Sequence, residues 1–308
     1  MSVPGWFLAN RARFEGRLLE NEALLKHSYY RIGGPAALLA IPQSESDLEF
    51  LSEGIRATGA EFFVTGMGSN LLISDGGVAA LVIKTTQANA ALELAESGRV
   101  IAGASVTVTS FLRRAGQEGW GGFELLTGIP GAMGGVVAMN AGTHLGEAKD
   151  RLESVTAIDL ATGEWKTYGK SELKFEYRRN LFLPPTAVVW ESTWRFEPKD
   201  PAQVKSLIDE TLLRRKTSQP LEYPSCGSVF KNPYESGKRA WEVIDQLKLR
   251  GHRIGNAQFS EKHPNFIVNL GGASSEDVYG LIQLAKQKAR DELGVSLHEE
   301  VKYLPARS

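Results

Sequence analysis

Glycines that gather in four short stretches constrain the fold of this chain more than any other feature of its sequence. The chain has 308 residues, of which 32 are glycine. Without a Cβ, glycine lets the backbone adopt positive φ angles and approach a neighbouring group closely. We therefore expect tight turns, each able to lie against another segment or a ligand, in RIGGPAA (31–37), TGMGSNLLISDGG (65–77), TGIPGAMGGVVAMNAG (127–142) and NLGGAS (269–274).

Two of these stretches have the composition of loops that hold an anion. GMGSNLL (66–72) directly follows an expected strand, and its Ser69 and Asn70 add side-chain donors to the backbone N–H groups. GIPGAMGG (128–135) is a second such loop with four glycines. Neither stretch matches the G-x-G-x-x-G dinucleotide fingerprint, and no G-x-x-x-x-G-K-S/T loop is present. Together they favour a cofactor that carries a pyrophosphate, while a tight turn remains the alternative interpretation of each loop alone.

Hydrophobic spacing and capping residues indicate helices and strands in irregular alternation. Residues 44–59 are typical of a capped helix, since Leu48, Leu51 and Ile55 share a face and Gly59 follows it. Because helices and strands do not alternate strictly, the sequence predicts an α+β fold, with a domain boundary near residue 217. Further helices are expected at 109–119, 200–220, 239–249 and 274–294, a hairpin at 154–169, and strands at 61–66, 71–74, 80–85, 99–108, 187–198, 266–269 and 298–304.

Composition argues against several classes of protein. Lysine and arginine total 35 and aspartate and glutamate total 36, so the net charge of −1 does not suit a nucleic-acid partner. No apolar stretch approaches the length of a membrane span and no signal peptide is visible, so we expect a cytoplasmic protein without a membrane partner. The single cysteine cannot form an internal disulfide, and the five histidines lack ligand spacing, so no metal site is expected.

PSCGSVFKNP (224–233) contains three side chains with reactive groups, Ser225, Cys226 and Ser228. A nucleophilic thiolate needs a nearby base or a positive environment. The sequence around Cys226 has no adjacent histidine, and the chain has no G-x-S-x-G signature. We interpret Cys226 and Ser225 as structural. For Ser228, the residues alone leave both turn chemistry and catalysis open.

Six motifs occur in an order that resembles one enzyme family. They are GMGSNLLISDGGVAALVIK, GFELLTGIPGAMGGVVAMNAG, FEYRRNLF, PSCGSVFKNP, RIGNAQFSEKHPNFIVN and EEVKYL. Over residues 27–305, these motifs closely resemble the UDP-N-acetylenolpyruvoylglucosamine reductases, the flavoenzymes of peptidoglycan precursor synthesis. The compact stretch at 220–240 is similar to the shorter subtype, which lacks an extra tyrosine-bearing substrate loop.

The resemblance implies a two-part FAD-binding region of the vanillyl-alcohol-oxidase type, followed by a C-terminal α+β substrate domain. On this basis we expect residues 1–85 and 86–217 to be the two FAD-binding subdomains. Residues 218–308 are then the substrate domain, and a return of the last few residues to the first subdomain is left open.

The resemblance also implies an oxidoreductase, UDP-N-acetylmuramate dehydrogenase, with FAD as cofactor, NADPH as co-substrate and a UDP-sugar as substrate. We expect the FAD to be non-covalent, because no residue stands in a context that favours a covalent flavin, and we favour a monomer. The residues that fall where the family holds FAD are Gly66, Gly68, Ser69, Asn70, Leu71, Gly128, Ile129, Pro130, Gly131, Gly134, Gly135, Asn140 and Ala141.

Three residues match catalytic positions of the family. The implied reaction adds hydride from flavin N5 to the terminal carbon of an enolpyruvyl group and leaves negative charge beside its carboxylate. Arg178 is expected to bind that carboxylate through its forked guanidinium. Glu300, in its protonated form, would polarise the carboxylate, and Ser228 would donate a proton to carbon as the general acid. Without the resemblance, Arg178 and Glu300 are more typical of solvated surface charges.

Four further residues are candidates for substrate binding. Asn232 matches a substrate contact of the family. Arg250, Lys262 and His263 are basic candidates for the nucleotide diphosphate, for which a solvated face is the alternative interpretation.

Two other functions remain as alternatives at this point. One is another FAD-dependent oxidoreductase of the same fold, which would need a base placed for substrate oxidation and often a covalent flavin. The sequence has a signature for neither. The other is a non-catalytic ligand-binding protein on the same scaffold, against which the presence of all three matched catalytic residues argues.

Overall fold

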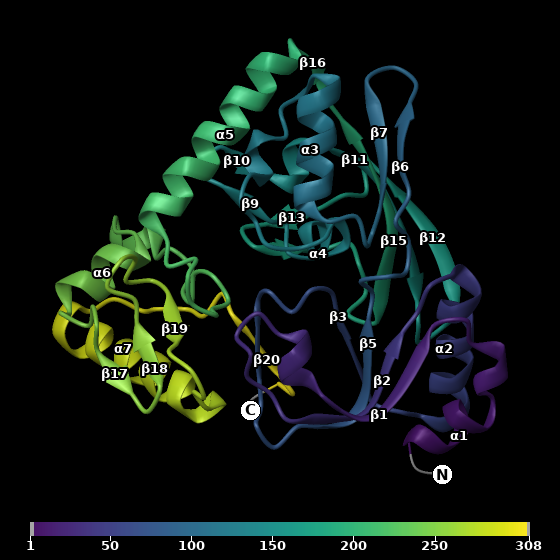
Figure 1. The fold of residues 1–308 in the computed structure, drawn as a ribbon, viewed down its shortest axis with the longest axis horizontal. Coiled ribbons are helices and arrows are strands. Elements are labelled where there is room, and N and C mark those ends of the chain that lie inside the picture. Colours follow the sequence, from purple (N-terminus) through teal and green to yellow (C-terminus); the bar gives the residue numbers. More distant parts are fainter. Residues whose placement is uncertain (1–2, 307–308) are drawn as a thin grey trace. The chain divides into compact units, whose positions relative to one another are not determined.

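A computed structural model describes residues 3–306, and the chain divides into two compact units (Figure 1). Neither unit is a single stretch of chain. The predicted division at residues 85 and 217 is not tested by this partition and stays a prediction. Unit 1 comprises Met1–Asn21, Ala37–Met67 and Ala80–Arg215, and unit 2 comprises Glu22–Ala36, Gly68–Ala79 and Lys216–Ser308.

The first part of unit 1 is a small sheet with two helices. Its elements are α1 (Val3–Ala9), β1 (Arg17–Ala23), β2 (Pro35–Ile41), α2 (Glu45–Thr58), β3 (Phe62–Thr65) and β5 (Val78–Lys84), with the 3₁₀ helix η1 at Arg11–Arg13. The strand order is β1-β2-β5-β3, and β3 runs parallel to β5. Phe7 of α1, Leu48 and Leu51 of α2 and Leu81 of β5 are fully buried in one cluster, which fixes the helices on the sheet.

A five-stranded antiparallel sheet makes up the second part of unit 1. It is built from β6 (Leu92–Ala95), β7 (Arg99–Gly103), β11 (Leu152–Asp159), β12 (Glu164–Gly169) and β15 (Ala187–Arg195), in the order β12-β11-β15-β7-β6. Its helices are α3 (Val108–Glu118), α4 (Met133–Ala138) and α5 (Pro201–Ser218). Trp194 of β15 and Phe111 of α3 are fully buried against each other, with Phe123 beside both.

Short elements complete this part of unit 1. Two of them, β13 and β14, form a two-stranded hairpin, and another, β9, pairs with β10. Their bounds are β8 (Trp120–Gly121), η3 (Glu124–Leu126), β9 (Gly142–Thr143), β10 (Gly146–Glu147), η4 (Ala148–Asp150), β13 (Phe175–Glu176), β14 (Arg179–Asn180) and β16 (Glu197–Pro198).

Unit 2 combines two helices with two small sheets. Its elements are η2 (Leu24–His27), β4 (Leu71–Ile73), η5 (Tyr234–Ser236), α6 (Ala240–Gln246), β17 (Arg253–Ile254), β18 (Ala257–Phe259), β19 (Ile267–Asn269), α7 (Ser275–Leu293) and β20 (Lys302–Leu304). Strands β17, β18 and β19 form an antiparallel meander. The last strand, β20, pairs in parallel with β4, which lies far earlier in the chain.

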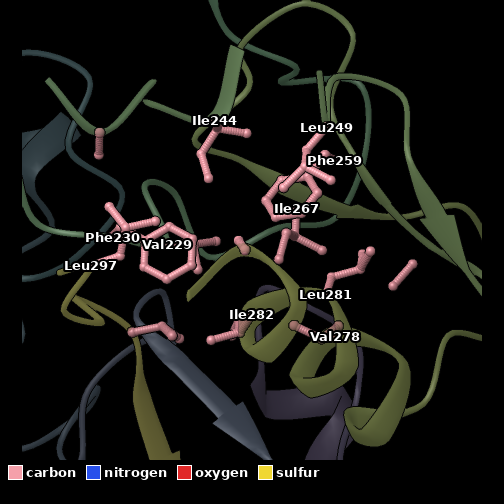
Figure 2. Packing of buried hydrophobic residues seen from close by; sticks show 14 of the residues in the cluster. Val229, Phe230, Ile244, Leu249, Phe259, Ile267, Val278, Leu281, Ile282 and Leu297 are labelled. Carbon is pink, nitrogen blue, oxygen red and sulfur yellow. The ribbon is translucent and has the colours of Figure 1, made fainter. Parts of the chain in front are cut away.

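The core of unit 2 forms around α7. Figure 2 shows Val278, Leu281 and Ile282 of this helix directed toward Phe259 and Ile267 of the meander, and all five side chains are almost completely buried. These three helical positions lie on one face because they are spaced three and four residues apart. The helix therefore holds the meander through one continuous apolar stripe.

Helix ends lie where local signals predict them. Ser44 accepts a hydrogen bond from the backbone of Asp47 at the start of α2, and Gly59 ends the helix with a φ of 64°. Ser274 and Asp277 form a capping box at the start of α7. The predicted helices at 44–59, 109–119, 200–220, 239–249 and 274–294, the hairpin at 154–169 and the α+β class are confirmed.

One local prediction was wrong, and several elements were missed. Residues 128–135 were predicted to be a loop, but α4 begins at Met133, so Gly134 and Gly135 lie in a helical turn. Tertiary packing against Ala104, rather than the low helix propensity of glycine, decides the conformation there. The sequence did not predict α1, β1 or β2.

Within residues 3–306, no helix has both the length and the hydrophobicity that crossing a membrane requires.

We expect Leu281→Ala to lower the free energy of unfolding by roughly 2–5 kcal/mol, because it removes a fully buried side chain from the unit 2 core. Leu213→Ala is the matched control, since Leu213 is 63% exposed on α5 and its loss should change stability by less than about 0.5 kcal/mol. Urea denaturation measures both. Equal losses for the two variants would contradict the assigned core.

Candidate active site

Ser228 lies on a segment that is hydrogen-bonded on both sides. It forms an antiparallel bridge with Phe266, and the adjacent Val229 N–H donates to the Asn265 carbonyl at 2.8 Å. On the other side, the Val229 carbonyl accepts a hydrogen bond from the Glu300 N–H, also at 2.8 Å. The structure therefore brings the predicted acid Ser228 and the predicted catalytic Glu300 onto neighbouring segments of unit 2.

Two residues fix the local path of the Ser228 segment. Gly227 has a φ of 74°, and a Cβ there would meet nothing within 4 Å, so backbone conformation rather than space requires glycine. Asn265 is 4% exposed and binds the main chain of Phe230 twice, accepting from its N–H at 3.0 Å and donating to its carbonyl at 2.9 Å. Sequence reasoning missed Asn265, whose only signal was a polar residue before the apolar run FIV.

The predicted cofactor loop of unit 2 is bonded to the Glu300 segment. The Asn70 side-chain amide donates to the Glu300 carbonyl at 3.0 Å, and the Lys302 N–H donates to the Asn70 carbonyl at 3.0 Å. Strands β4 and β20 continue this contact with Leu71 opposite Lys302. Residues 68–71 thus lie next to Glu300 in the same unit.

Cys226 joins the Ser228 segment to the same loop. Its thiol donates to the Leu71 carbonyl at 3.1 Å, and the residue is only 4% exposed. Burial raises the pKa of the Cys226 thiol to about 12, so the reactive thiolate is scarce at neutral pH. In the same loop, Gly68 packs closely on the backbone of His27, since a Cβ at Gly68 would lie 2.4 Å from the His27 carbonyl oxygen. The thiol acts as a structural donor, as the sequence suggested.

Arg178 belongs to unit 1, where it occupies the turn between β13 and β14 with a φ of 58°. Its Nη2 donates to the Gly142 carbonyl at 2.9 Å, and its guanidinium lies 5.0 Å from the centre of the Tyr177 ring. Asn180, in the same hairpin, donates to the Ala138 carbonyl at 2.7 Å. These contacts tie the hairpin to the end of α4 and to the segment that follows it.

The glycine loop of unit 1 is held by backbone hydrogen bonds on both sides. The Val108 N–H donates to the Gly131 carbonyl at 2.9 Å, and the Met133 N–H donates to the Val106 carbonyl at 2.9 Å. Between these bonds and Gly128 lie the predicted cofactor residues Ile129 and Pro130, of which Pro130 is exposed.

The glycines of the two predicted cofactor loops serve two different purposes. A Cβ at Gly134 would lie 2.9 Å from the Ala104 Cβ, so this glycine permits close packing within the protein. A Cβ at Gly66 or at Gly135 would meet nothing within 4 Å, so the backbone there faces open space. Positions of the second kind are those that a ligand can approach.

Arg215 provides a cation beside this glycine loop. A Cβ at Gly128 would lie 2.4 Å from Arg215 Nε, so the guanidinium stem packs directly on the loop. Burial lowers the pKa of Arg215, and no anionic partner for it is present among residues 3–306. A half-buried cation beside the predicted cofactor loop fits the phosphates of FAD. Sequence reasoning missed Arg215, which resembled one more solvated charge on a helix.

Asn140 and Ala141 are predicted cofactor residues whose polar groups have partners inside the protein. Asn140 is fully buried, and its amide donates to Glu147 and to the Glu176 carbonyl, both at 3.0 Å. Its side-chain oxygen accepts from the Lys149 N–H. The Ala141 N–H donates to the Val136 carbonyl. A role of these two residues in FAD binding stays a prediction.

The substrate candidates differ in how their side chains are used. Asn232 accepts a hydrogen bond from the Ala240 N–H at 3.0 Å at the start of α6. The His263 ring packs edge-on against Phe266, the bridge partner of Ser228. Both residues border the Ser228 segment, whereas the remaining two candidates lie in other contacts.

Arg250 is exposed and forms two hydrogen bonds to the Asp245 carboxylate, at 2.8 and 3.0 Å. This pairing lowers the pKa of Asp245. Lys262 donates to the Lys216 carbonyl at 2.7 Å. These contacts use part of the donor capacity of each side chain, and the predicted substrate roles of Arg250 and Lys262 stay predictions.

Two further features of the described residues bear on the search for a site. A hollow of about 650 Å³ in unit 1, lined by Gln43, Gln87, Asn89 and Trp190 among others, contains none of the predicted site residues. Among residues 3–306, no group of three or more His, Cys, Asp or Glu side chains is arranged to hold a metal ion.

Comparison with known proteins gives matches over most of the chain. The family model described as UDP-N-acetylenolpyruvoylglucosamine reductase, C-terminal domain, matches residues 219–304, and the FAD binding domain model matches residues 36–169. The chain is similar to the UDP-N-acetylenolpyruvoylglucosamine reductase of Geobacter metallireducens, with 39% identity over 95% of each chain. It is similar to that of Synechococcus sp., with 40% identity over 95% of this chain and 93% of the relative.

A solved structure matches as well. The UDP-N-acetylenolpyruvylglucosamine reductase of Thermus caldophilus is 33% identical, with a TM-score of 0.77 over 94% of this chain and 98% of that one. Together with the FAD-binding match, this confirms the expected fold, with its FAD-binding region and C-terminal domain.

We expect the Cys226 thiol to resist modification by a disulfide reagent at about pH 8 in the folded protein. With a pKa of about 12, only on the order of one thiol in ten thousand is ionised, and the group is buried. Absorbance of the released thiolate measures the reaction, and the protein unfolded in urea is the control that should react fully. A folded protein that reacts as fast as the unfolded one would contradict this assignment.

Proposed function

The chain belongs to the family of UDP-N-acetylenolpyruvoylglucosamine reductases, and from this premise we propose that Ser228, Arg178 and Glu300 carry out the family's reaction here. The chain is an FAD-dependent oxidoreductase of peptidoglycan precursor synthesis. The reaction converts UDP-N-acetylglucosamine enolpyruvate to UDP-N-acetylmuramate. NADPH is the proposed source of electrons, the cytoplasm the proposed compartment and a monomer the proposed form.

The chemistry defines three tasks for the protein. Reduction of the enolpyruvyl group adds a hydride to its terminal carbon and a proton to the carbon that bears the carboxylate. Bound FAD supplies the hydride at its N5 atom. The residues must hold the substrate carboxylate, stabilise the negative charge that develops beside it, and deliver one proton to carbon.

Arg178 and Glu300 are assigned to the carboxylate. A guanidinium is permanently charged and can bind both carboxylate oxygens at once, which spreads the charge that develops during hydride addition. Protonated Glu300 would donate a hydrogen bond to the same group. The Arg178 contacts with Gly142 and Tyr177 support this assignment because they restrain a long and flexible side chain.

Ser228 is assigned as the proton donor. An alcohol is a weak acid, but the carbon that accepts the proton is strongly basic, so position matters more than acidity. The observation that carries the proposal is the hydrogen bond from the Glu300 N–H to the Val229 carbonyl at 2.8 Å. It keeps the proposed acid and the proposed carboxylate partner on adjacent strands of backbone in unit 2.

The nucleotide half of the substrate is assigned to the remaining candidates. Asn232 and His263 border the Ser228 segment, and we propose that they contact the UDP-sugar. Lys262 and Arg250 already donate to a carbonyl and to a carboxylate, and we propose that their remaining N–H donors contact the diphosphate.

Purified protein should contain flavin absorbance and should oxidise NADPH in a manner that depends on UDP-N-acetylglucosamine enolpyruvate. Release of the flavin by mild denaturation checks that it is non-covalent. Another FAD-dependent oxidoreductase of this fold would contain flavin but ignore this substrate. A non-catalytic binding protein would show no substrate-dependent oxidation of NADPH at all. Either of these two outcomes would contradict the proposed reaction.

Ser228→Ala should leave the reduction of bound flavin by NADPH nearly intact and slow its reoxidation by substrate by roughly 10²–10⁴-fold, the range for loss of a general acid. Stopped-flow absorbance of the flavin measures the two half-reactions separately.

Ser225→Ala is the matched control for this variant, because it removes a hydroxyl from the same segment without touching the proposed acid. It should leave both half-reactions unchanged. If instead Cys226→Ser abolished activity while Ser228→Ala did not, the assignment of the acid would be wrong.

A further inference from the structure

Glu147 lies beside the proposed catalytic Arg178, at the end of β10. Its Oε1 is 3.9 Å from Arg178 Nη1. The Glu147 side chain is 17% exposed and that of Arg178 is 16% exposed. Charges that are largely removed from water are screened much less than surface charges. This carboxylate therefore acts on the guanidinium more strongly than an exposed ion pair would.

The Glu147 carboxylate is itself fixed from other directions. Its Oε2 accepts a hydrogen bond from the Asn140 side-chain amide at 3.0 Å and lies 2.9 Å from Lys149 Nζ. The Glu147 backbone N–H donates to the Asp150 carboxylate at 2.8 Å, which fixes the main chain at the start of η4. Because it contacts both Asn140 and Lys149, the carboxylate is restrained to one orientation and can in turn restrain a neighbouring side chain.

Asn140 connects this carboxylate to the hairpin that carries Arg178. Besides Glu147, its amide donates to the carbonyl of Glu176, two residues before Arg178. Asn140 is fully buried, so both hydrogen bonds are formed away from competing water. The carboxylate and the turn are thus held by the same buried amide.

We propose that Glu147 is a positioning residue for Arg178, which it holds in the orientation that receives the substrate carboxylate. This rests on the proposed function. The Gly142 carbonyl, the Tyr177 ring and the Glu147 carboxylate all contact or closely approach the guanidinium and together restrain it. At 3.9 Å the carboxylate attracts the guanidinium without the short contact of a hydrogen bond. An arginine oriented in advance stabilises developing charge without reorganisation during the reaction.

Glu147→Gln tests the proposal with little change in side-chain shape. We expect reoxidation of the flavin by substrate to slow about tenfold, within the range for coupled neighbouring residues. The KM for the UDP-sugar should change by less than about twofold, because other residues bind the nucleotide. Flavin content and reduction by NADPH should match the wild type. Glu176→Gln is the control, since that carboxylate is exposed on the same hairpin and pairs with Arg179.

A double-mutant cycle with Arg178→Lys separates positioning from a general structural effect. If Glu147 acts through Arg178, Glu147→Gln should slow flavin reoxidation by a much smaller factor in the Arg178→Lys background than in the wild type. An equal reduction of the reoxidation rate in both backgrounds would overturn the proposal. So would a loss of flavin content and thermal stability in Glu147→Gln alone.

A measurement that needs no turnover keeps this inference distinct from the proposed reaction. In the FAD-loaded protein, the side-chain Nε–H signal of Arg178 can be assigned in ¹⁵N spectra by its absence from Arg178→Lys. It should report a restrained guanidinium in the wild type and in Glu176→Gln, and a mobile one in Glu147→Gln. An unchanged signal in Glu147→Gln would overturn the positioning role, whether or not the protein reduces the proposed substrate.

Discussion

Hydrogen bonds among three separate segments of unit 2 are the constraint on which the proposed acid site depends. Residues 68–73 contribute the cofactor loop and β4, residues 226–231 contribute Ser228, and residues 299–304 contribute Glu300 and β20. Most of these bonds join main-chain groups, so their geometry does not rely on flexible side chains. A buried main-chain group that loses its partner costs about 1–3 kcal/mol. The three segments are therefore held as one layer, and a substitution that shifts the backbone of one segment weakens its hydrogen bonds to the other two.

The predictability of the fold follows the range of the interactions that determine it. Helix α2 was predictable because Ser44, Gly59 and the spacing of three apolar residues are all local signals. The pairing of β20 with β4 could not be derived from periodicity, because no local pattern specifies a partner so far away in the chain. The start of α4 was misread for the same reason, since it depends on the contact of Gly134 with Ala104.

The candidate site shows the same division. Ser228, Arg178 and Glu300 were assigned because ordered motifs resemble a known family, not because their chemistry is visible in isolation, and their catalytic roles stay predictions. Asn265, Arg215 and Glu147 were missed, since each acquires its role only from a tertiary neighbour: the Phe230 backbone, the Gly128 loop and the Arg178 guanidinium. Cys226 is a case in which the local sequence was sufficient, because the absence of an adjacent histidine favoured a structural thiol and the structure shows a buried hydrogen-bond donor.

The discontinuous make-up of unit 2 has a consequence for the synthesis of the chain on the ribosome. Glu22–Ala36 and Gly68–Ala79 emerge early, but most of their unit, Lys216–Ser308, is made only after all of unit 1. During that interval Ile32 and Leu72, which are buried in the finished unit, have no core to enter. Transiently exposed apolar segments are the ones that chaperones bind and that aggregate. The folding hazard of this protein therefore lies in its first eighty residues, although the hazard ends only when its last strand is complete.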